Sequence, residues 1–356
     1  MSLPKMVMVT GATGLVGGGV LRRMLADDSA LDAFALVRDD ASWCRLACEL
    51  GPMADRVVPI RGDVTLPHLG LEPLVHRRVL LQTTAIVHAA ADTSFSRTLA
   101  RSLEVNTIGT AHVVALALEC QRLDRLAFVS TAFVAGRATG SIAERDNGCK
   151  AGWVNTYEQS KYEAESIVRS STIVCRSPDG DVSQINAVHR ALRIYHRGLA
   201  AMMPGDRSNP LDVVTAEFVS DAIARLTLDA RARDKTVHLC AGRNALTLGE
   251  VVDTAYDVWS AQPEWRKRRV EPALIADAET YRLFEAAVHE TGDPRLRAIL
   301  TSLSHFIPQL ALPKVFETFV AEDLLGSAPP CPREFWLPML EQLLATNWGH
   351  STQEAA

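Results

Sequence analysis

The sequence predicts an α/β protein with a doubly wound parallel sheet and a smaller, mostly helical lobe at its C-terminus. Residues 6–19 read as a strand, a glycine-rich turn and the start of a helix. Short apolar strands and amphipathic helices then alternate over much of the chain up to residue 246, and the pattern is mostly helical from residue 247. We therefore expect a sheet domain over 1–246 and a helical lobe over 247–356, with 176–210 able to contribute to the lobe.

Size and composition limit the class of protein. The 356 residues fit one enlarged α/β domain with an appended lobe. A hydrophobic fraction of 47% and a net charge of −5 suit a soluble globular protein and offer no overall charge for binding nucleic acid. The 7 cysteines form no C-x-x-C pair and the 10 histidines show no ligand spacing, so we expect reduced thiols and no metal. No secretory signal and no membrane span are apparent, which predicts a cytoplasmic protein.

The glycine-rich turn is the first candidate binding site. Gly11 lets the chain reverse, Gly14 lets the backbone approach a diphosphate, and Gly17 lets the helix pack close to the strand. The backbone N–H groups of the first helical turn then face an anion, and Thr13 and Leu15 flank the central glycine. The alternative is an ordinary strand-to-helix turn. Because a strand precedes the triplet and a helix follows it, we favour Rossmann-type dinucleotide binding.

The second strand, over 33–37, ends where the adenosine ribose of such a cofactor would lie. Arg38 follows it and could pair with the 2′-phosphate of NADP. In the alternative, Arg38 is a solvated turn residue and Asp39 binds the ribose hydroxyls of NAD. Because the arginine comes first, we expect NADPH rather than NADH.

The third strand, over 57–60, runs into Gly62, Asp63 and Val64, and a crossover helix is expected over 71–81. Asp63 could hydrogen-bond the adenine amino group, with Val64 beside it. It could equally be a turn aspartate.

The fourth strand, over 85–88, is followed by Ala89 and Ala90, whose small side chains let the backbone pass close to a cofactor. A long helix is expected over 98–121. It contains Asn106 on an otherwise apolar surface, and this amide must be hydrogen-bonded if it is buried.

The fifth strand, over 126–129, delivers Ser130 and Thr131 to the carboxyl edge of the sheet, where ligands bind in open parallel sheets. A polar loop follows over 136–154. A helix is then expected from residue 156 to residue 168.

Tyr157 and Lys161 on this helix form the candidate catalytic pair. Their i, i+4 spacing puts both side chains on one helical face, about 6 Å apart at the backbone. A phenol titrates near 10, and a neighbouring ammonium favours its ionised form, so the lysine could lower the pKa of the tyrosine. The alternative is a chance pair on a solvated helix.

The remaining third reads as the substrate lobe. Met202 and Met203 could line an acyl pocket, although methionines also serve as plain packing. The basic cluster 266–269 could receive coenzyme A phosphates or an acidic carrier protein, or it could be a solvated turn. The expected helices are 185–196, 248–259, 276–289, 295–304, 314–324 and 334–345.

Together these motifs resemble the extended short-chain dehydrogenase/reductases. The shared motifs are the T-G-A-T-G-x-x-G loop, G-D-V, Asn106, Ser130-Thr131 and Y-x-x-x-K. Within that branch, the sequence is similar to those of thioester reductases and fatty acyl-CoA reductases. The segments that carry this likeness are VHAAADTSFS (87–96), VNTIGTAHVV (105–114), FVSTAFVAG (128–136) and YEQSKYEAE (157–165), with weaker likeness at 211–223, 236–251 and 306–316.

The resemblance implies a role for each matching residue. Tyr157 would donate a proton to the substrate oxygen, and Lys161 would bind the nicotinamide ribose and tune Tyr157. Thr131 would hydrogen-bond the reacting carbonyl, and Asn106 would hold a relay water or brace the site. The chain departs from the family after Lys161, where a longer helix and an Arg-Pro segment are usual; the nearest proline here is Pro178.

The function that the resemblance implies is NADPH-dependent reduction of an acyl thioester to an aldehyde, with a second reduction to the alcohol left open. The substrate would be an acyl-CoA or a chain on an acyl or peptidyl carrier protein. Two alternatives remain: action on a hydroxysteroid or nucleotide sugar with the same residues, and a non-catalytic NADP-binding regulator.

Overall fold

The central feature of the fold is a seven-stranded sheet whose paired strands are all parallel. The computed structural model describes residues 5–145, 151–170, 175–177, 187–291, 294–346 and 348. Across the sheet the strands run in the order β10-β7-β5-β4-β1-β2-β3. Their bounds are β1 Lys5–Thr10, β2 Leu31–Val37, β3 Val57–Arg61, β4 Ala85–His88, β5 Arg125–Val129, β7 Cys175–Ser177 and β10 Lys235–Thr236. This order reverses direction beside β1, which confirms the expected doubly wound, Rossmann-type sheet.

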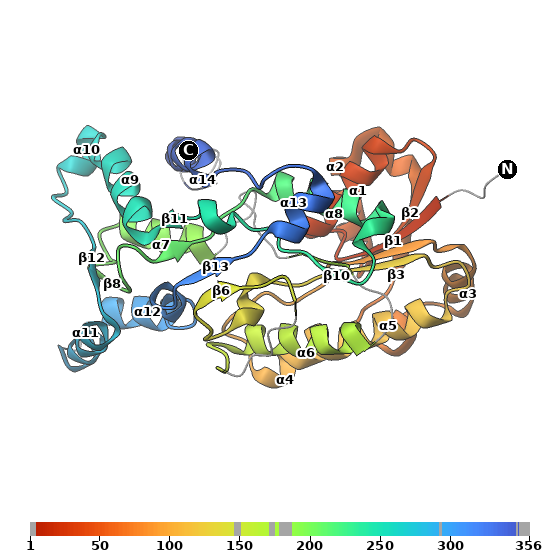
Figure 1. Cartoon of the computed structure of the whole chain (residues 1–356), viewed down its shortest axis with the longest axis horizontal. Helices are drawn as coiled ribbons and strands as arrows, with labels where there is room; N and C mark the ends of the chain where they lie inside the picture. The colour runs from red at the N-terminus through yellow and green to blue at the C-terminus, as the bar shows by residue number, and fades with distance from the viewer. Residues whose placement is uncertain are drawn as a thin grey trace.

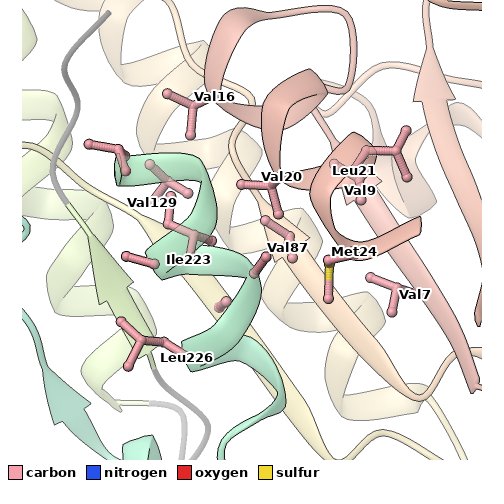
Figure 2. Packing of buried hydrophobic residues seen from close by; sticks show 14 of the residues in the cluster. Val7, Val9, Val16, Val20, Leu21, Met24, Val87, Val129, Ile223 and Leu226 are labelled. Carbon is pink, nitrogen blue, oxygen red and sulfur yellow. The ribbon is translucent and has the colours of Figure 1, made fainter. Parts of the chain in front are cut away.

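Helices cover both faces of this sheet, and the alternation of β1 shows why. Val7 and Val9 point into one apolar core while Met6 and Met8 point into the other. The first core is closed by α1 Leu15–Asp27, α2 Asp40–Leu50, α8 Ala216–Leu228 and α13 Phe319–Leu325. Figure 2 shows α1 and α8 meeting there through Val16, Val20, Ile223 and Leu226. The second core is closed by α3 Pro73–Gln82, α5 Gly109–Glu119 and α6 Thr156–Ser170.

A second, mostly helical unit lies at the other end of the molecule from β1, β2 and β3 (Figure 1). Its core is rich in aromatic rings and includes the fully buried Trp259 and Trp336. The helices are α7 Ala187–His196, α9 Leu248–Ser260, α10 Pro263–Arg266, α11 Ala278–Thr291, α12 Pro294–Leu303 and α14 Pro332–Ala345. Two short strand pairs accompany them, β8 Met202–Pro204 with β12 Leu274–Ala276 and β9 Pro210–Leu211 with β11 Leu246–Thr247.

The helix expected over 314–324 is wrong in its first half. Residues Lys314–Phe316 form strand β13, which pairs in parallel with β6 Gly140–Ile142, and helix α13 begins only at Phe319. The Glu144 carboxylate accepts hydrogen bonds from the backbone N–H groups of Val320 and Ala321 and so holds the start of the helix. A pairing partner far away in the sequence therefore overrode the local helical pattern.

Two further expectations need qualification. The helix expected over 98–121 is present as α4 Leu99–Ser102 and α5, joined by a π-helical turn over Leu103–Ile108. Pro178, the proline considered for seating the nicotinamide, lies outside the described residues, as does the segment 171–174. Within the described residues, no helix is both long enough and apolar enough to cross a membrane.

Candidate active site

The glycine-rich turn is packed so tightly that side chains would collide in it. Gly11 has φ +69°, and a Cβ there would lie 2.7 Å from the carbonyl carbon of Ala89 and the amide nitrogen of Ala90. Gly17 sits over the carbonyl oxygen of Gly11, which also accepts a hydrogen bond of 2.9 Å from the Gly14 N–H. Gly14 is the N-cap of α1 and supplies no side-chain cap. Gly14 therefore offers no side chain to the first backbone N–H groups of α1, from which an anion could accept hydrogen bonds, and Thr13 and Leu15 flank it in sequence.

The end of β2 presents an exposed Arg38 and an aspartate that already has a structural task. Asp39 is the N-cap of α2, and its Oδ1 accepts a hydrogen bond of 2.7 Å from the Ser42 N–H. That bond holds the pKa of Asp39 below its usual value. Arg61 ends the neighbouring strand and is paired in register with Val37, so a second guanidinium group comes to this edge. Sequence reasoning missed Arg61, which strand register alone could have indicated.

Asp63 is built into a turn. Its Oδ1 accepts hydrogen bonds of 2.8 Å from both the backbone N–H and the hydroxyl of Thr65. Val64 beside it is buried and lies against Gly109, where a Cβ would come within 3.0 Å of a Val64 methyl group. The contacts of this carboxylate are those of a turn aspartate. A contact of Asp63 with adenine remains a prediction.

A buried histidine, which sequence reasoning did not single out, links the two alanines after β4 to the helix that carries Asn106. Thr10 Oγ1 accepts a hydrogen bond from the Ala90 N–H and lies 2.7 Å from His88 Nδ1. His88 Nε2 lies 3.0 Å from Thr110 Oγ1, whose hydroxyl donates to the carbonyl oxygen of Asn106. Since Thr110 donates elsewhere, it accepts from Nε2–H, and Nδ1 accepts from Thr10.

This assignment requires a neutral imidazole, which the surroundings of His88 favour. Burial, together with the charge of Lys161, lowers the pKa of His88 to about 3. A neutral His88 thus joins two hydroxyl groups, those of Thr10 and Thr110. Thr10 holds the Ala90 N–H, and Thr110 holds the carbonyl oxygen of Asn106.

Asn106 lies in the π-helical turn and ties the loop after β4 to α6. Its Oδ1 accepts a hydrogen bond of 2.8 Å from the Asp92 N–H, and its Nδ2 donates to the Asp92 carbonyl at 3.0 Å and to Ser160 Oγ at 2.9 Å. The Ser160 hydroxyl donates in turn to the carbonyl oxygen of Tyr157. These bonds fit the bracing role expected for Asn106, which stays a prediction.

Tyr157 and Lys161 are both buried on α6, at 3% and 2% exposure. Lys161 Nζ donates a hydrogen bond of 2.7 Å to the carbonyl oxygen of Val129, the last residue of β5, and lies 4.2 Å from the centre of the Phe128 ring. The ammonium group is therefore held at the carboxyl edge of the sheet.

The two residues that follow β5 complete this edge. Thr131 is buried, and its Oγ1 accepts a hydrogen bond of 3.3 Å from the Phe133 N–H at the start of a short 3-10 turn. Ser130 Oγ donates to the buried Glu165 carboxylate at 2.5 Å, and Arg169 contacts the other oxygen of Glu165 at 3.3 Å. Glu165 thus anchors the end of β5 to α6, a role that its place within YEQSKYEAE did not reveal.

A cluster of three phenylalanine rings contacts Tyr157 through Phe95, and one of the three rings comes from the helical unit. The Phe95 ring centre lies 5.5 Å from that of Tyr157 and 5.5 Å from that of Phe133. Phe306 lies parallel to Phe95 within 6° and edge-on to Phe133, at 6.4 Å from each. Sequence reasoning did not single out these phenylalanines, since they are far apart in the chain. Tyr157 therefore has an aromatic cluster on the side that Phe95 occupies.

A second contact between the helical unit and α6 involves the residue after Tyr157. Glu158 is fully buried and accepts hydrogen bonds from the Val154 N–H at 2.8 Å, from Asn155 Nδ2 at 3.0 Å and from Gln309 Nε2 at 2.6 Å. Gln309 Oε1 accepts in turn from Lys314 Nζ at 2.7 Å. Burial raises the pKa of Glu158. The segment 306–314 thus contacts Phe95, which packs against Tyr157, and also the carboxylate of Glu158.

The basic cluster 266–269 makes its described contacts with nearby residues of the helical unit. Arg268 donates to the carbonyl oxygens of His196 and Arg197 at the end of α7, and Lys267 pairs with Glu264. These contacts are typical of a charged turn at the surface.

A family model and several known proteins match this chain. A model of the Male sterility protein family matches residues 9–223, a span that contains every residue assigned to the site above from sequence. A linear gramicidin synthase protein of Brevibacillus parabrevis is 28% identical over 262 residues, which cover 65% of this chain and 5% of that protein. A putative fatty acyl-CoA reductase of Drosophila melanogaster is 28% identical over 145 residues, or 36% of this chain and 28% of that one. The chain therefore spans a small part of the curated relatives it matches.

Among solved structures, the terminal R domain from the myxalamid PKS-NRPS biosynthetic pathway is similar, with a TM-score of 0.78 at 22% identity. The similarity covers 99% of this chain and 93% of that one. The helical unit is included in this match, so the fold as a whole is shared.

Proposed function

Because the chain belongs to the Male sterility protein family, an NAD-binding family, we propose that it uses NADPH to reduce an acyl thioester to an aldehyde. The chain is an NAD(P)-dependent oxidoreductase of the extended short-chain dehydrogenase/reductase type. The observation that carries the substrate class is the ring cluster beside Tyr157. Phenylalanines at this position suit an apolar acyl chain, whereas a nucleotide sugar would require polar partners there.

The residues have distinct tasks in this proposal. Gly11, Gly14, Gly17 and the N-terminus of α1 would hold NADPH, which would supply a hydride when bound. Addition to the thioester carbonyl builds negative charge on its oxygen, and donors aimed at that oxygen lower the barrier. Tyr157 donates the proton to it, and the Thr131 hydroxyl hydrogen-bonds it.

Lys161 has a positioning role beside Tyr157 and would hold the ribose of the nicotinamide. Its ammonium group is held by the Val129 carbonyl oxygen and the Phe128 ring. The product of hydride and proton addition is a hemithioacetal, and breaking its C–S bond releases the thiol and leaves the aldehyde. A second reduction of that aldehyde would give the alcohol with the same residues.

The thioester is carried either by coenzyme A or by a carrier protein in this proposal. Both have support in the relatives' names, since one is a putative fatty acyl-CoA reductase and another belongs to a gramicidin synthase. An acyl-CoA and an acyl-loaded carrier protein share the acyl thioester, which is the part that the ring cluster beside Tyr157 would contact.

The direct test follows NADPH absorbance with a panel of acyl-CoA thioesters and acyl-loaded carrier proteins. We expect NADPH consumption that is matched by release of free thiol. Consumption with a hydroxysteroid or nucleotide sugar partner and not with any thioester would overturn the proposal. Cofactor binding without turnover on any of these would favour the regulator instead.

Replacing Arg38 by serine tests the cofactor preference. We expect the KM for NADPH to rise by about 10- to 100-fold, since a charged hydrogen bond contributes about 1.5–3 kcal/mol, while the KM for NADH changes little. Steady-state kinetics with both cofactors measure this.

The matched control is Arg282→Ser, which removes an exposed arginine from α11. Equal losses with NADPH and NADH in the Arg38→Ser variant, or no loss with either, would show that Arg38 does not bind the 2′-phosphate.

A further inference from the structure

Two histidines and a glutamate meet at the surface beside α3 and α5, away from the ring cluster beside Tyr157. His68 lies in the 3-10 turn Pro67–Gly70, His76 lies in α3 and Glu119 ends α5. One potential ligand atom from each residue lies within 4.8 Å of the other two. The two imidazole rings are in edge contact, with centres 4.9 Å apart and an angle of 73° between their planes.

His76 has an unmet hydrogen-bonding requirement in this cluster. Its Nε2 is shielded from solvent and has no hydrogen-bond partner among the described residues. Buried polar atoms in folded proteins nearly always have a partner, because leaving one without a partner costs free energy. The cluster therefore contains a nitrogen that the protein alone does not satisfy.

We propose that His68, His76 and Glu119 bind a divalent transition-metal ion, Zn²⁺ in the first instance, with water as the fourth ligand. Two imidazoles and one carboxylate form a common zinc ligand set, and imidazole favours Zn²⁺ over Mg²⁺ or Ca²⁺. Bonds of about 2.0–2.2 Å place tetrahedral ligand atoms about 3.3 Å apart. Closing the cluster to that spacing requires small rotations of His68 and Glu119, both of which have exposed side chains.

The metal would act on the cofactor site through the turn that contains His68. The Leu69 carbonyl accepts a hydrogen bond of 2.8 Å from the Asp63 N–H, and the Asp63 carbonyl accepts one of 3.1 Å from the Leu66 N–H. A Cβ on Gly62 would lie 2.4 Å from the same Leu69 oxygen, so the turn and the segment 62–63 are in close contact.

The conformation of this turn is one that needs support. His68 and Leu69 have φ values of 51° and 58°, in the left-handed region that residues with side chains rarely adopt. An ion bound to α3, to α5 and to His68 would fix the turn against both helices. It would thereby fix Asp63, the residue expected beside the adenine. Resting on that proposed cofactor site, we infer that Zn²⁺ tightens binding of the dinucleotide.

Calorimetric titration of ZnCl₂ into the chelator-stripped full chain tests the site. We expect one ion per chain and at least tenfold weaker binding in His76→Gln and in His68→Gln, the latter altering an exposed side chain. His289→Gln, an exposed histidine of α11, is the matched control and should bind as the wild type does. Equal affinity in the wild type and both cluster variants would overturn the proposal.

Dinucleotide affinity with and without Zn²⁺ tests the coupling to the cofactor site. We expect the Kd for NADPH to fall by about threefold or more on adding Zn²⁺ to the wild type and to stay constant in His68→Gln. A Kd that is unaffected by Zn²⁺ in the wild type would refute the coupling. Neither experiment uses an acyl substrate, so neither outcome depends on thioester reduction. The coupling rests on the proposed binding of NADPH, which the titration without Zn²⁺ measures separately.

Discussion

Replacing Tyr157 by phenylalanine is expected to lower turnover by about 10²- to 10⁴-fold while leaving the affinity for NADPH unchanged. In the proposed reaction this hydroxyl delivers the proton that neutralises the oxygen formed by hydride addition. The ring itself remains in the variant, so its packing against Phe95 at 5.5 Å is preserved. Turnover is measured by NADPH consumption with the best thioester of the panel, and affinity by titration of the cofactor.

Tyr162 offers a matched control on the same helix. Its ring packs against Trp153 at 5.4 Å, and Tyr162→Phe removes a hydroxyl from α6 without touching the proposed proton donor. We expect wild-type turnover from it. If Tyr157→Phe instead kept more than about a tenth of wild-type turnover, the proton would have to come from another group, and the assignment of Tyr157 would be wrong.

The part of the fold that sequence predicted well is the part specified by local pattern. The strands β1, β2, β4 and β5 are short apolar runs buried on both faces, and such runs differ clearly from the helices between them. The polar residues that follow these strands, such as Arg38 and Thr131, come to one edge because all strand pairs of the seven-stranded sheet are parallel. The sequence therefore predicted which strand-end residues share this edge, and their roles in a site stay predictions.

The contacts that sequence could not predict join segments far apart in the chain. Lys314–Phe316 forms a strand because β6 supplies its partner, and nothing in its own pattern indicates this. Glu158 is similar, since its partner Gln309 lies in the helical unit and its burial depends on that contact. A glutamate next to Tyr157 would otherwise be placed on the solvated face of a helix.

Histidines were the least predictable residues, since their spacing suggested neither of the roles described above. His88 ends a buried strand and depends on hydroxyl partners from β1 and α5. His68 and His76 approach each other because His68 and Leu69 both adopt left-handed backbone conformations. Neither residue is a glycine, so the sequence does not indicate this turn. The hydrogen bonds of His88 and the approach of His68 to His76 both arise from tertiary packing, not from the spacing of histidines along the chain.

The Gly17→Ala variant is expected to lose most of its cofactor affinity and to unfold at a lower temperature than the wild type. An alanine Cβ would lie 2.3 Å from the carbonyl oxygen of Gly11, a backbone atom that cannot move alone because it also holds the Gly14 N–H at 2.9 Å. Displacing it would distort the turn that presents the first N–H groups of α1. Overpacking of this kind costs about 1–3 kcal/mol of stability.

Gly18→Ala, one residue further along α1, separates this clash from the general effect of an added methyl group. Its Cβ would lie 3.0 Å from the Ala12 carbonyl oxygen, and the gain in helix propensity of about 1 kcal/mol offsets much of that contact. Thermal unfolding and NADPH titration of both variants should therefore place Gly18→Ala near the wild type and Gly17→Ala far below it. Equal behaviour of the two variants would mean that the close approach of Gly17 to Gly11 does not shape the cofactor site.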